Sequence, residues 1–496
     1  MRPHPLLYQI NTWVWLTDLS QHYGVTITLE NVPDEELDRI AAYHFDAVWL
    51  MGIWERSVHG RVVAQTLSNL REEYRRALPT VTELEIVGSP YAVYRYSVDP
   101  HYGGRAALAS IRARLARRGL KLILDYVPNH VAIDNPTLLS HAAAYVQATP
   151  HLLSAHPEWF FKPPIPNAPP DMYVAHGRDP YFAPWSDTAQ VDAFAPAARQ
   201  LAIETLSDIA SQSDGVRCDM AMLLVNRIFA STWGRTEQPA EEFWRVVIPA
   251  IKRQFPDFQF IAEVYWDMEG ELLAQGFDYC YDKRLYDRLL HESPQAVRDH
   301  ISADVRYQRQ MVRFVENHDE ARAVTAFGPA RSRAAAALSL TLPGMGFVHE
   351  GQIEGRKVKV PVQLGQRVAE PPDPDSIAFY RRLLDVLDDP AFHDGVWMQL
   401  APLPFPHDGA NYDALIAYAW AYRGDWRVIV ANVSGAEIRA RLPLPNPALD
   451  GAAQWQFEDV LSGGEPITCP SGQLLAGGLP LTLPPNTVRI YRMRSV

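Results

Sequence analysis

The sequence is poor in cysteine and has no long apolar run. Its 496 residues contain three cysteines, Cys218, Cys280 and Cys469, which lie far apart. An odd number of widely spaced thiols excludes the disulfide framework of a small secreted domain. No apolar stretch reaches the roughly 20 residues that cross a bilayer, so no membrane-spanning segment is predicted.

The beginning of the chain also lacks the marks of a secretion signal. The first residues, MRPHPLLYQINTWVWL, show no charged region followed by an apolar run and a small-residue cleavage site. They lead almost at once into a strand-like segment. We therefore expect a cytoplasmic protein.

Basic residues are in the minority. The sequence has 46 lysines and arginines against 58 aspartates and glutamates, a formal net charge of −12, and no long basic run. This charge disfavours contact with phosphate backbones, so we expect no nucleic-acid partner. With 47% hydrophobic residues, a chain of this length buries a sizeable core and is expected to form more than one domain.

Charged and polar residues follow four strand-like apolar runs. The segments are LILDYVPNHV with Asp125, Asn129 and His130, GVRCDMAM with Arg217 and Asp219, FIAEVYW with Glu263, and FVENHDE with Asn317, His318 and Asp319. An ionised carboxylate is costly to bury without a partner, so a core has no use for acids at these positions. In a parallel barrel, catalysis takes place at the carboxyl ends of the strands. The pattern therefore predicts an enzyme that works with carboxylates.

Eight strand-like runs alternate with helical patterns up to about residue 390. The runs cover residues 7–15, 45–53, 120–127, 214–220, 258–266, 277–282, 311–317 and 343–350. Helical patterns over 105–119 and 240–255 place their apolar residues on one face. Apolar strands between helices are typical of a parallel sheet covered on its outside. The count of eight favours a (β/α)8 TIM barrel, although a doubly wound open sheet has a similar alternation.

Two stretches interrupt this alternation. Residues 131–196 form a long insertion rich in proline, histidine and aromatic residues. From about residue 391, runs at 414–420, 426–433 and 481–493 are separated by turn residues and predict an antiparallel β-domain. We predict a catalytic barrel over 1–130 and 197–390, an inserted domain over 131–196 and a C-terminal β-sandwich domain over 391–496.

The four strand ends resemble the four sequence regions of the α-amylase family of glycoside hydrolases. The patterns Asp-x-x-x-Asn-His, Gly-x-Arg-x-Asp, a single Glu and Asn-His-Asp occur in the family's order, at residues 125–130, 215–219, 263 and 317–319. The resemblance covers most of residues 5–390. It implies a barrel whose inserted domain B forms one wall of the cleft, and a C-terminal sandwich.

The resemblance also implies roles for the charged residues. Asp219 resembles the nucleophile and Glu263 the general acid and base of a retaining glycosidase, whose carboxyl groups lie about 5–5.5 Å apart. Asp319 is the expected third catalytic carboxylate, which grips sugar hydroxyls. Arg217 lies two residues before Asp219 and so shares its face of the strand, where it holds the carboxylate ionised. Asp125 is expected to bond to Arg217 at the floor of the site.

Histidine and aromatic residues are the expected sugar contacts. His130 and His318 resemble donors to the hydroxyls of the cleaved sugar, and Tyr91 matches the tyrosine that stacks beneath it. Tyr265 and Trp185 are candidates for flanking subsites, because pyranose faces stack on aromatic rings. Trp54, Tyr173 and Trp266 are further candidates of this kind. The alternative for these aromatic residues is that they pack loops together.

The chain departs from the family after the nucleophile. Many α-amylases have Ala-x-Lys-His there, whereas this chain has Met222 in place of the lysine. An apolar side chain at the leaving-group side predicts a preference for short oligosaccharides over starch. No cofactor is expected to be required. Asn129 is a candidate ligand for calcium, which prefers oxygen ligands, and Asp134, Asn135, Asp171, Asp179 and Asp187 are other oxygen donors of the insertion.

The predicted activity is that of a retaining α-glycoside hydrolase on carbohydrate. The expected substrates are glucan oligosaccharides with α-glucosidic bonds, of the α-1,4 type first. A transglycosylase, a glucosylmutase and a phosphorylase of the same family are alternatives, since each passes the same glycosyl-enzyme to a different acceptor. A non-catalytic carbohydrate-binding relative is a remote alternative, because such proteins usually lack the carboxylates that this chain has.

Overall fold

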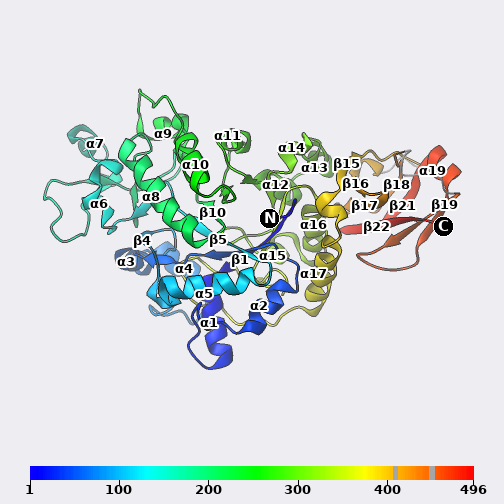
Figure 1. Ribbon diagram of the computed structural model, residues 1–496, viewed down its shortest axis with the longest axis horizontal. Helices are drawn as coiled ribbons and strands as arrows, with labels where there is room; N and C mark the ends of the chain where they lie inside the picture. The colour runs from blue at the N-terminus through cyan, green and yellow to red at the C-terminus, as the bar shows by residue number, and fades with distance from the viewer. Residues whose placement is uncertain (406–410, 446–452) are drawn as a thin grey trace.

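A closed barrel of eight parallel strands forms the body of the molecule. The computed structural model describes residues 1–405, 411–445 and 453–496 (Figure 1). The strands are β1 (Leu6–Asn11), β2 (Ala47–Met51), β5 (Lys121–Tyr126), β10 (Gly215–Cys218), β11 (Gln259–Ala262), β12 (Tyr279–Tyr281), β13 (Met311–Arg313) and β14 (Met345–His349). Each pairs with the next in the chain, and β14 closes on β1. The predicted (β/α)8 barrel is confirmed, and the open sheet is excluded.

The strands are shorter than the apolar runs that predicted them. The run over 7–15 is a strand only as far as Asn11, and Trp13 and Trp15 belong to helix α1 (Thr12–Tyr23). The Asn11 side chain accepts a hydrogen bond from the Val14 amide at 3.5 Å, as a helix N-cap does. Asp219 and Glu263 lie just past the ends of β10 and β11, so both acids stand at the carboxyl rim of the barrel.

Helices cover the outside of the barrel, and a core of buried aliphatic and aromatic side chains joins the two layers. The longer ones are α2 (Asp34–Ala41), α3 (Val58–Thr66), α4 (Ser68–Ala77), α5 (Gly104–Ala116), α8 (Pro196–Gln212), α9 (Asn226–Trp233), α10 (Phe243–Gln254), α12 (Lys283–His291), α13 (Pro294–Ile301), α16 (Pro329–Thr341) and α17 (Pro374–Leu387). The shorter helices are α11 (Glu269–Ala274), α14 (Val305–Gln308), α15 (Ala323–Phe327) and α18 (Ala391–Asp394). The predicted amphipathic helices correspond to α5 and α10.

Short elements are inserted between β5 and α8, ahead of the helix that leads to β10. They are β6 (His130–Ala132), α6 (Thr137–Ser140), α7 (Pro150–Ala155), β7 (Phe160–Phe161), β8 (Val174–Ala175) and β9 (Thr188–Gln190). β6 pairs with β9, and a small apolar cluster of its own packs beneath them. A second two-stranded antiparallel sheet, β3 (Trp54–Arg56) with β4 (Val93–Val98), lies next to β6. Figure 1 shows α6 and α7 at one end of the molecule.

An antiparallel β-domain stands at the other end (Figure 1). Its main sheet has the order β15-β16-β17-β22-β19-β20, and β18 pairs with β21 across a shared apolar cluster. The bounds are β15 (Val396–Leu400), β16 (Ile416–Tyr422), β17 (Asp425–Asn432), β18 (Ile438–Leu442), β19 (Gln454–Asp459), β20 (Ile467–Pro470), β21 (Leu479–Leu483) and β22 (Thr487–Ser495). The predicted antiparallel domain is confirmed. One helix, α19 (Ser471–Gly477), was not expected there.

Two aromatic residues of β16 attach this domain to the barrel. The Trp420 indole donates a hydrogen bond to the Thr341 carbonyl at 2.8 Å, and the Tyr418 and Thr341 hydroxyls are 2.6 Å apart. Thr341 is the last residue of α16, so the β-domain rests on a barrel helix. Within the described part of the chain, no helix is both long and apolar enough to span a membrane.

Candidate active site

Strand register brings two acids together at the barrel rim. Cys218 of β10 lies opposite Ala262 of β11, so the residues that follow, Asp219 and Glu263, are neighbours on adjacent strands. The Glu263 amide donates to the Cys218 carbonyl at 3.0 Å, and the Asp219 amide donates to the Tyr126 carbonyl at 2.8 Å. Hydrogen bonds of the barrel thus continue one residue past the strands and hold both acids in place.

One buried arginine binds both acids. The Arg217 side chain is 1% exposed, and its Nη1 donates to Asp219 Oδ1 at 2.6 Å while its Nη2 is 2.9 Å from Glu263 Oε2. Three rings, Trp49, Tyr91 and Tyr281, lie about the guanidinium at 5.3, 5.3 and 5.7 Å. The aromatic rings exclude water and face the cation with their π-systems. Asp219 and Glu263 therefore share a single, fixed countercharge.

The Glu263 carboxyl group is enclosed on both oxygens. Oε2 also accepts a hydrogen bond from the Met220 amide at 2.6 Å, and Oε1 accepts one from the Tyr265 hydroxyl at 2.7 Å. Met220 has a φ of 42°, in the left-handed region. At this turn of the backbone the Met220 amide points towards Glu263. Burial raises the pKa of Glu263 to about 7; Arg217 opposes the rise, and the negative charges of Asp219 and Asp319 add to it.

Asp219 and Asp125 are buried beside the same arginine. Burial raises the pKa of each carboxyl group above its usual value, and Arg217 works against the rise. Asp125 Oδ2 accepts a hydrogen bond from the Gly52 amide at 2.7 Å. The expected ion pair between Asp125 and Arg217 is wrong, because Arg217 pairs with Asp219 and Glu263 among the described residues. Asp125 lies opposite Arg217 on β5 and bonds to the backbone instead.

Asp319 is the exposed acid of the group. Its side chain is 44% exposed, and its Oδ2 is 3.0 Å from His318 Nε2. The same His318 nitrogen lies 2.7 Å from the Tyr91 hydroxyl, and the two rings stack at 5.4 Å. Burial works to raise the pKa of Asp319, but His318, Arg217 and Lys359 together hold it well below its usual range. Asp319 is therefore ionised and open to a ligand.

Two site residues escaped the sequence analysis. Gln9 of β1 is fully buried, and its Nε2 lies 2.7 Å from His318 Nδ1. A buried amide within the strand run LLYQIN is the signal that could have revealed it. Lys359, in the loop after β14, donates a hydrogen bond to the Asp319 carbonyl. Its position in a long loop offers no pattern that a sequence alone reveals.

His130 and Trp185 lie together in the inserted segment. Their ring centroids are 5.1 Å apart, His130 is buried on β6, and Trp185 is half-buried. Burial lowers the pKa of His130 to about 4, so this imidazole is neutral at pH 7. A neutral imidazole still offers one donor and one acceptor to a hydroxyl group.

Four of the oxygen donors proposed for calcium, at Asn129, Asp134, Asn135 and Asp179, already have protein partners. Asn129 Oδ1 accepts a hydrogen bond from Gln190 Nε2 at 2.9 Å. Asp134 bonds to the Ser57 hydroxyl at 2.6 Å, and Asn135 bonds to Thr137. Among the residues that the structure describes, no three histidine, cysteine or acidic side chains form a cluster suited to a metal. These side chains do not fit a calcium ion, and no chemical step is assigned to one.

Two expectations about substrate contacts are wrong. Met222 is fully buried in the apolar core and contacts no leaving group, because the turn at Met220 carries the chain inwards. Trp54 is 1% exposed, and its indole donates to the Asp125 carbonyl at 2.8 Å. Trp54 therefore supports the strand end rather than a sugar.

Comparison with known proteins agrees with the barrel and the strand-end acids. Residues 34–268 match the family model for the catalytic domain of α-amylase. The chain is 23% identical over 282 residues to α-amylase 3 of Dictyoglomus thermophilum, 53% of each protein. The residues that match this family model make up slightly less than half of the chain. The chain spans about half the length of the curated relatives it matches.

Solved structures show the same fold along the whole chain. A noncanonic maltogenic α-amylase from Thermotoga neapolitana matches with a TM-score of 0.66 and 18% identity, over 99% of this chain and 98% of that one. A trehalulose synthase mutant matches with a TM-score of 0.67 and 16% identity, over 99% of both chains. At these identities the likeness concerns the fold.

The shared arginine leads to a first prediction. Arg217→Met should lower the free energy of unfolding at pH 7 by about 3–5 kcal/mol, because two buried carboxylates lose their countercharge. In this variant the folded-state pKa values of both acids rise above their unfolded values. The loss should therefore shrink as the pH falls and the acids become protonated.

Urea denaturation at pH 7 and pH 5.5 measures both effects. Arg117→Met, at the exposed end of α5, is the matched control and should change little. Equal stability of the Arg217→Met variant and the unchanged protein at pH 7 would contradict the shared ion pair.

Proposed function

We propose that the protein is a retaining glycoside hydrolase that cleaves α-glucosidic bonds of glucan oligosaccharides. The observation that carries the proposal is that Arg217 binds Asp219 and Glu263 together, at 2.6 and 2.9 Å. A retaining glycosidase needs two carboxyl groups close together, one ionised and one protonated. The two acids here share a cation but differ in their other contacts.

Asp219 is the proposed nucleophile. Its carboxylate attacks the anomeric carbon, the bond to the leaving oxygen breaks, and a proton from Glu263 passes to that oxygen. In the second half, Glu263 takes a proton from water, the resulting hydroxyl attacks the anomeric carbon, and Asp219 is released. Arg217 supports the ionised state of Asp219, and a pKa of about 7 allows Glu263 to act as acid and as base.

The hydrogen bonds of Glu263 indicate where its proton resides. Oε2 faces two N–H donors, the Met220 amide and the Arg217 guanidinium, and neither accepts a proton. Oε1 faces only the Tyr265 hydroxyl, which donates to the ionised group and accepts from the protonated one. We therefore assign the transferred proton to Oε1, and Tyr265 the role of a positioning residue.

Exposed residues near the acids support a sugar as the substrate. Asp319 is open to a ligand, and Tyr91 stands beside it against His318. Trp266, three residues after Glu263, is 38% exposed and lies 5.0 Å from the ring of Tyr181 in the inserted segment. Aromatic rings of this kind bind pyranose faces. We propose that these rings hold the sugar units on either side of the cleaved bond.

Transglycosylation is the alternative that a specific comparison favours. The trehalulose synthase structure has the same fold, so this architecture accommodates a transfer as well as a hydrolysis. The two reactions share the glycosyl-enzyme and differ in the acceptor. The presence of three acids argues against a non-catalytic relative.

The stereochemistry of the product tests the proposal. We expect proton NMR of the fresh product from maltotriose to show the α-anomer first, because two displacements at one carbon restore its configuration. Initial release of the β-anomer would mean inversion, and would rule out Asp219 as a covalent nucleophile. Sugars longer than maltotriose among the products would identify transglycosylation.

Substitution of the two acids separates their roles. Asp219→Asn should abolish turnover, and Glu263→Gln should reduce it by about 10²–10⁴-fold. A substrate with an activated leaving group needs little protonation, so it should partly restore the first step in Glu263→Gln and not in Asp219→Asn. Circular dichroism checks that both variants fold. Equal responses to the activated substrate would mean that the assigned roles are wrong.

The pH profile tests the position of the proton. For the unchanged enzyme, kcat/KM should fall as the pH rises through about 7, because Glu263 must be protonated to act as the acid. Tyr265→Phe removes a donor to ionised Glu263, so the pKa should rise and the alkaline limb should move to higher pH. The expected shift is up to about one unit, since a hydrogen bond to a charged group contributes ~1.5 kcal/mol and one unit is ~1.4 kcal/mol.

Tyr307→Phe on α14 is the matched control and should leave the limb in place. The other groups that face Glu263, namely Arg217, Asp219, Asp319 and the Met220 amide, are unchanged in both variants. An unmoved limb in Tyr265→Phe, with reduced activity at every pH, would contradict the assignment of the proton to Oε1.

A further inference from the structure

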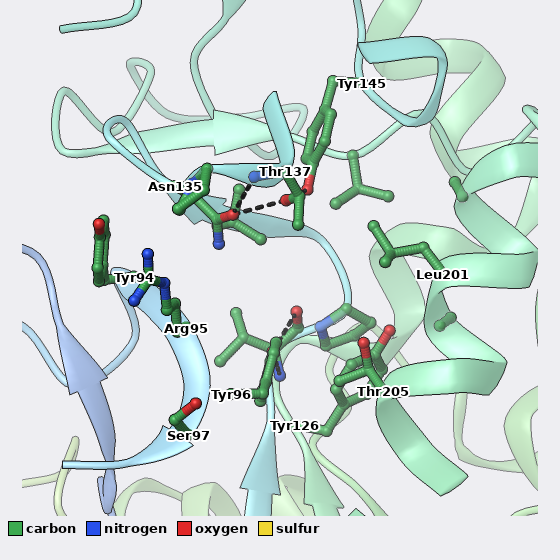
Figure 2. Close-up of a pocket in the computed structure, with 17 residues that line it drawn as sticks. Tyr94, Arg95, Tyr96, Ser97, Tyr126, Asn135, Thr137, Tyr145, Leu201 and Thr205 are labelled. Carbon is green, nitrogen blue, oxygen red and sulfur yellow. Dashed lines mark hydrogen bonds between the residues drawn. The ribbon is translucent and has the colours of Figure 1, made fainter. Parts of the chain in front are cut away.

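A cavity lies beside the barrel, apart from the proposed catalytic residues. It has a volume of about 320 Å³ and lies between β4, the end of β5, the inserted segment and α8 (Figure 2). None of the acids at the strand ends lines it. At ~30 Å³ per molecule this space equals about ten waters, and it falls at the lower end of the range of small-molecule sites.

Tyrosine rings from three segments form the walls. Tyr94 and Tyr96 come from β4, Tyr126 from the end of β5, and Tyr145 from the inserted segment. The Tyr96 hydroxyl accepts from the Val127 amide at 2.9 Å and donates to its carbonyl at 3.1 Å, so this ring is held in place. The rings of Tyr96 and Tyr126 contact each other at 5.6 Å. The cavity thus has rigid aromatic faces.

Hydrogen-bonding groups without a protein partner reach the same space. Tyr126 is 5% exposed, and its hydroxyl forms no hydrogen bond with any described residue. The Thr205 hydroxyl of α8 likewise has no partner in the described chain. The Arg95 guanidinium stacks on the Tyr94 ring at 4.9 Å and forms no ion pair there (Figure 2). These groups open into the cavity, where a ligand or water can form hydrogen bonds with them.

These groups define the chemistry of the occupant. It must offer acceptors to two hydroxyls and a guanidinium, and it must have apolar faces that stack on tyrosine rings. No carboxylate lines the cavity, so a cation is not the fit. A pyranose ring has oxygen atoms around its edge and C–H groups on its faces, and one such ring suits a cavity of this size.

We propose that this cavity binds one hexosyl unit of an α-glucan, as a second sugar site separate from the catalytic one. The identity of the sugar rests on the proposed function. Tyr126 connects the two places, since its ring lines the cavity while its carbonyl accepts the hydrogen bond of the Asp219 amide at 2.8 Å. An occupant that bonds to the Tyr126 hydroxyl therefore contacts the same residue whose backbone carbonyl holds the Asp219 amide.

Equilibrium binding of maltose to the Asp219→Asn full chain tests the proposal. This background turns over no substrate, and we expect calorimetry to reveal two binding sites. Leu201→Trp, which fills the cavity from α8, should remove one of them, and Tyr126→Phe should weaken that site about five-fold, as the loss of one hydrogen bond does. Leu475→Trp on the exposed face of α19 is the matched control and should retain both.

A crystal soaked with maltose should show a sugar ring against Tyr96 and Tyr126. A single binding site in the Asp219→Asn chain that Leu201→Trp leaves unaffected, or a cavity that holds only water in the soaked crystal, would overturn the proposal. If glucose 6-phosphate bound more than about ten-fold tighter than glucose, the proposal that the occupant is a neutral sugar ring would be overturned. If the unchanged enzyme cleaves maltotriose and the cavity binds no sugar, this inference alone fails. If the cavity binds maltose and the enzyme cleaves no α-glucoside, the proposed function alone fails.

Discussion

The contact of one buried guanidinium with two carboxylates is the interaction on which the site depends. Three acids at the end of a barrel repel one another and lose hydration, and burial alone raises their pKa values. Arg217 offsets this cost from within the barrel wall, where it is 1% exposed and surrounded by aromatic rings. A planar guanidinium has two nitrogen atoms for two different partners, which a lysine ammonium does not provide in fixed geometry.

The acids then differ because their remaining contacts differ. Glu263 is enclosed, with a tyrosine hydroxyl on one oxygen and N–H donors on the other, and its pKa is about 7. Asp319 is 44% exposed and faces His318, and its pKa lies well below the usual range. One type of functional group thus yields a proton donor and a permanent anion. Pairs of acids whose surroundings separate their pKa values in this way are typical of acid–base sites.

The inserted segment serves the molecule on two sides. Towards the acids it contributes His130 and Trp185, which contact each other at 5.1 Å. Away from them it closes the tyrosine-lined cavity, which Tyr145 lines together with Tyr94 and Tyr96 of β4. Both sides depend on the pairing of β6 with β9, because these two paired strands determine where the segment leaves and re-enters the barrel. A proline-rich insertion with little regular structure therefore still positions side chains accurately.

The sequence by itself determined that the apolar strands end in acidic residues, and it favoured a barrel over an open sheet. Apolar runs that end in Asp219, Glu263 and Asp319 reflect a local rule, since a strand buried on both faces tolerates charge only at its end. Tertiary structure decided what each side chain contacts. Met222 lies three residues after Asp219 in the chain but is buried in the core. Trp54 is buried as well, and Gln9, far from the acids in the chain, reaches His318 across the barrel. Those outcomes depend on a left-handed turn at Met220 and on the closure of β14 against β1, which no local pattern of residues encodes.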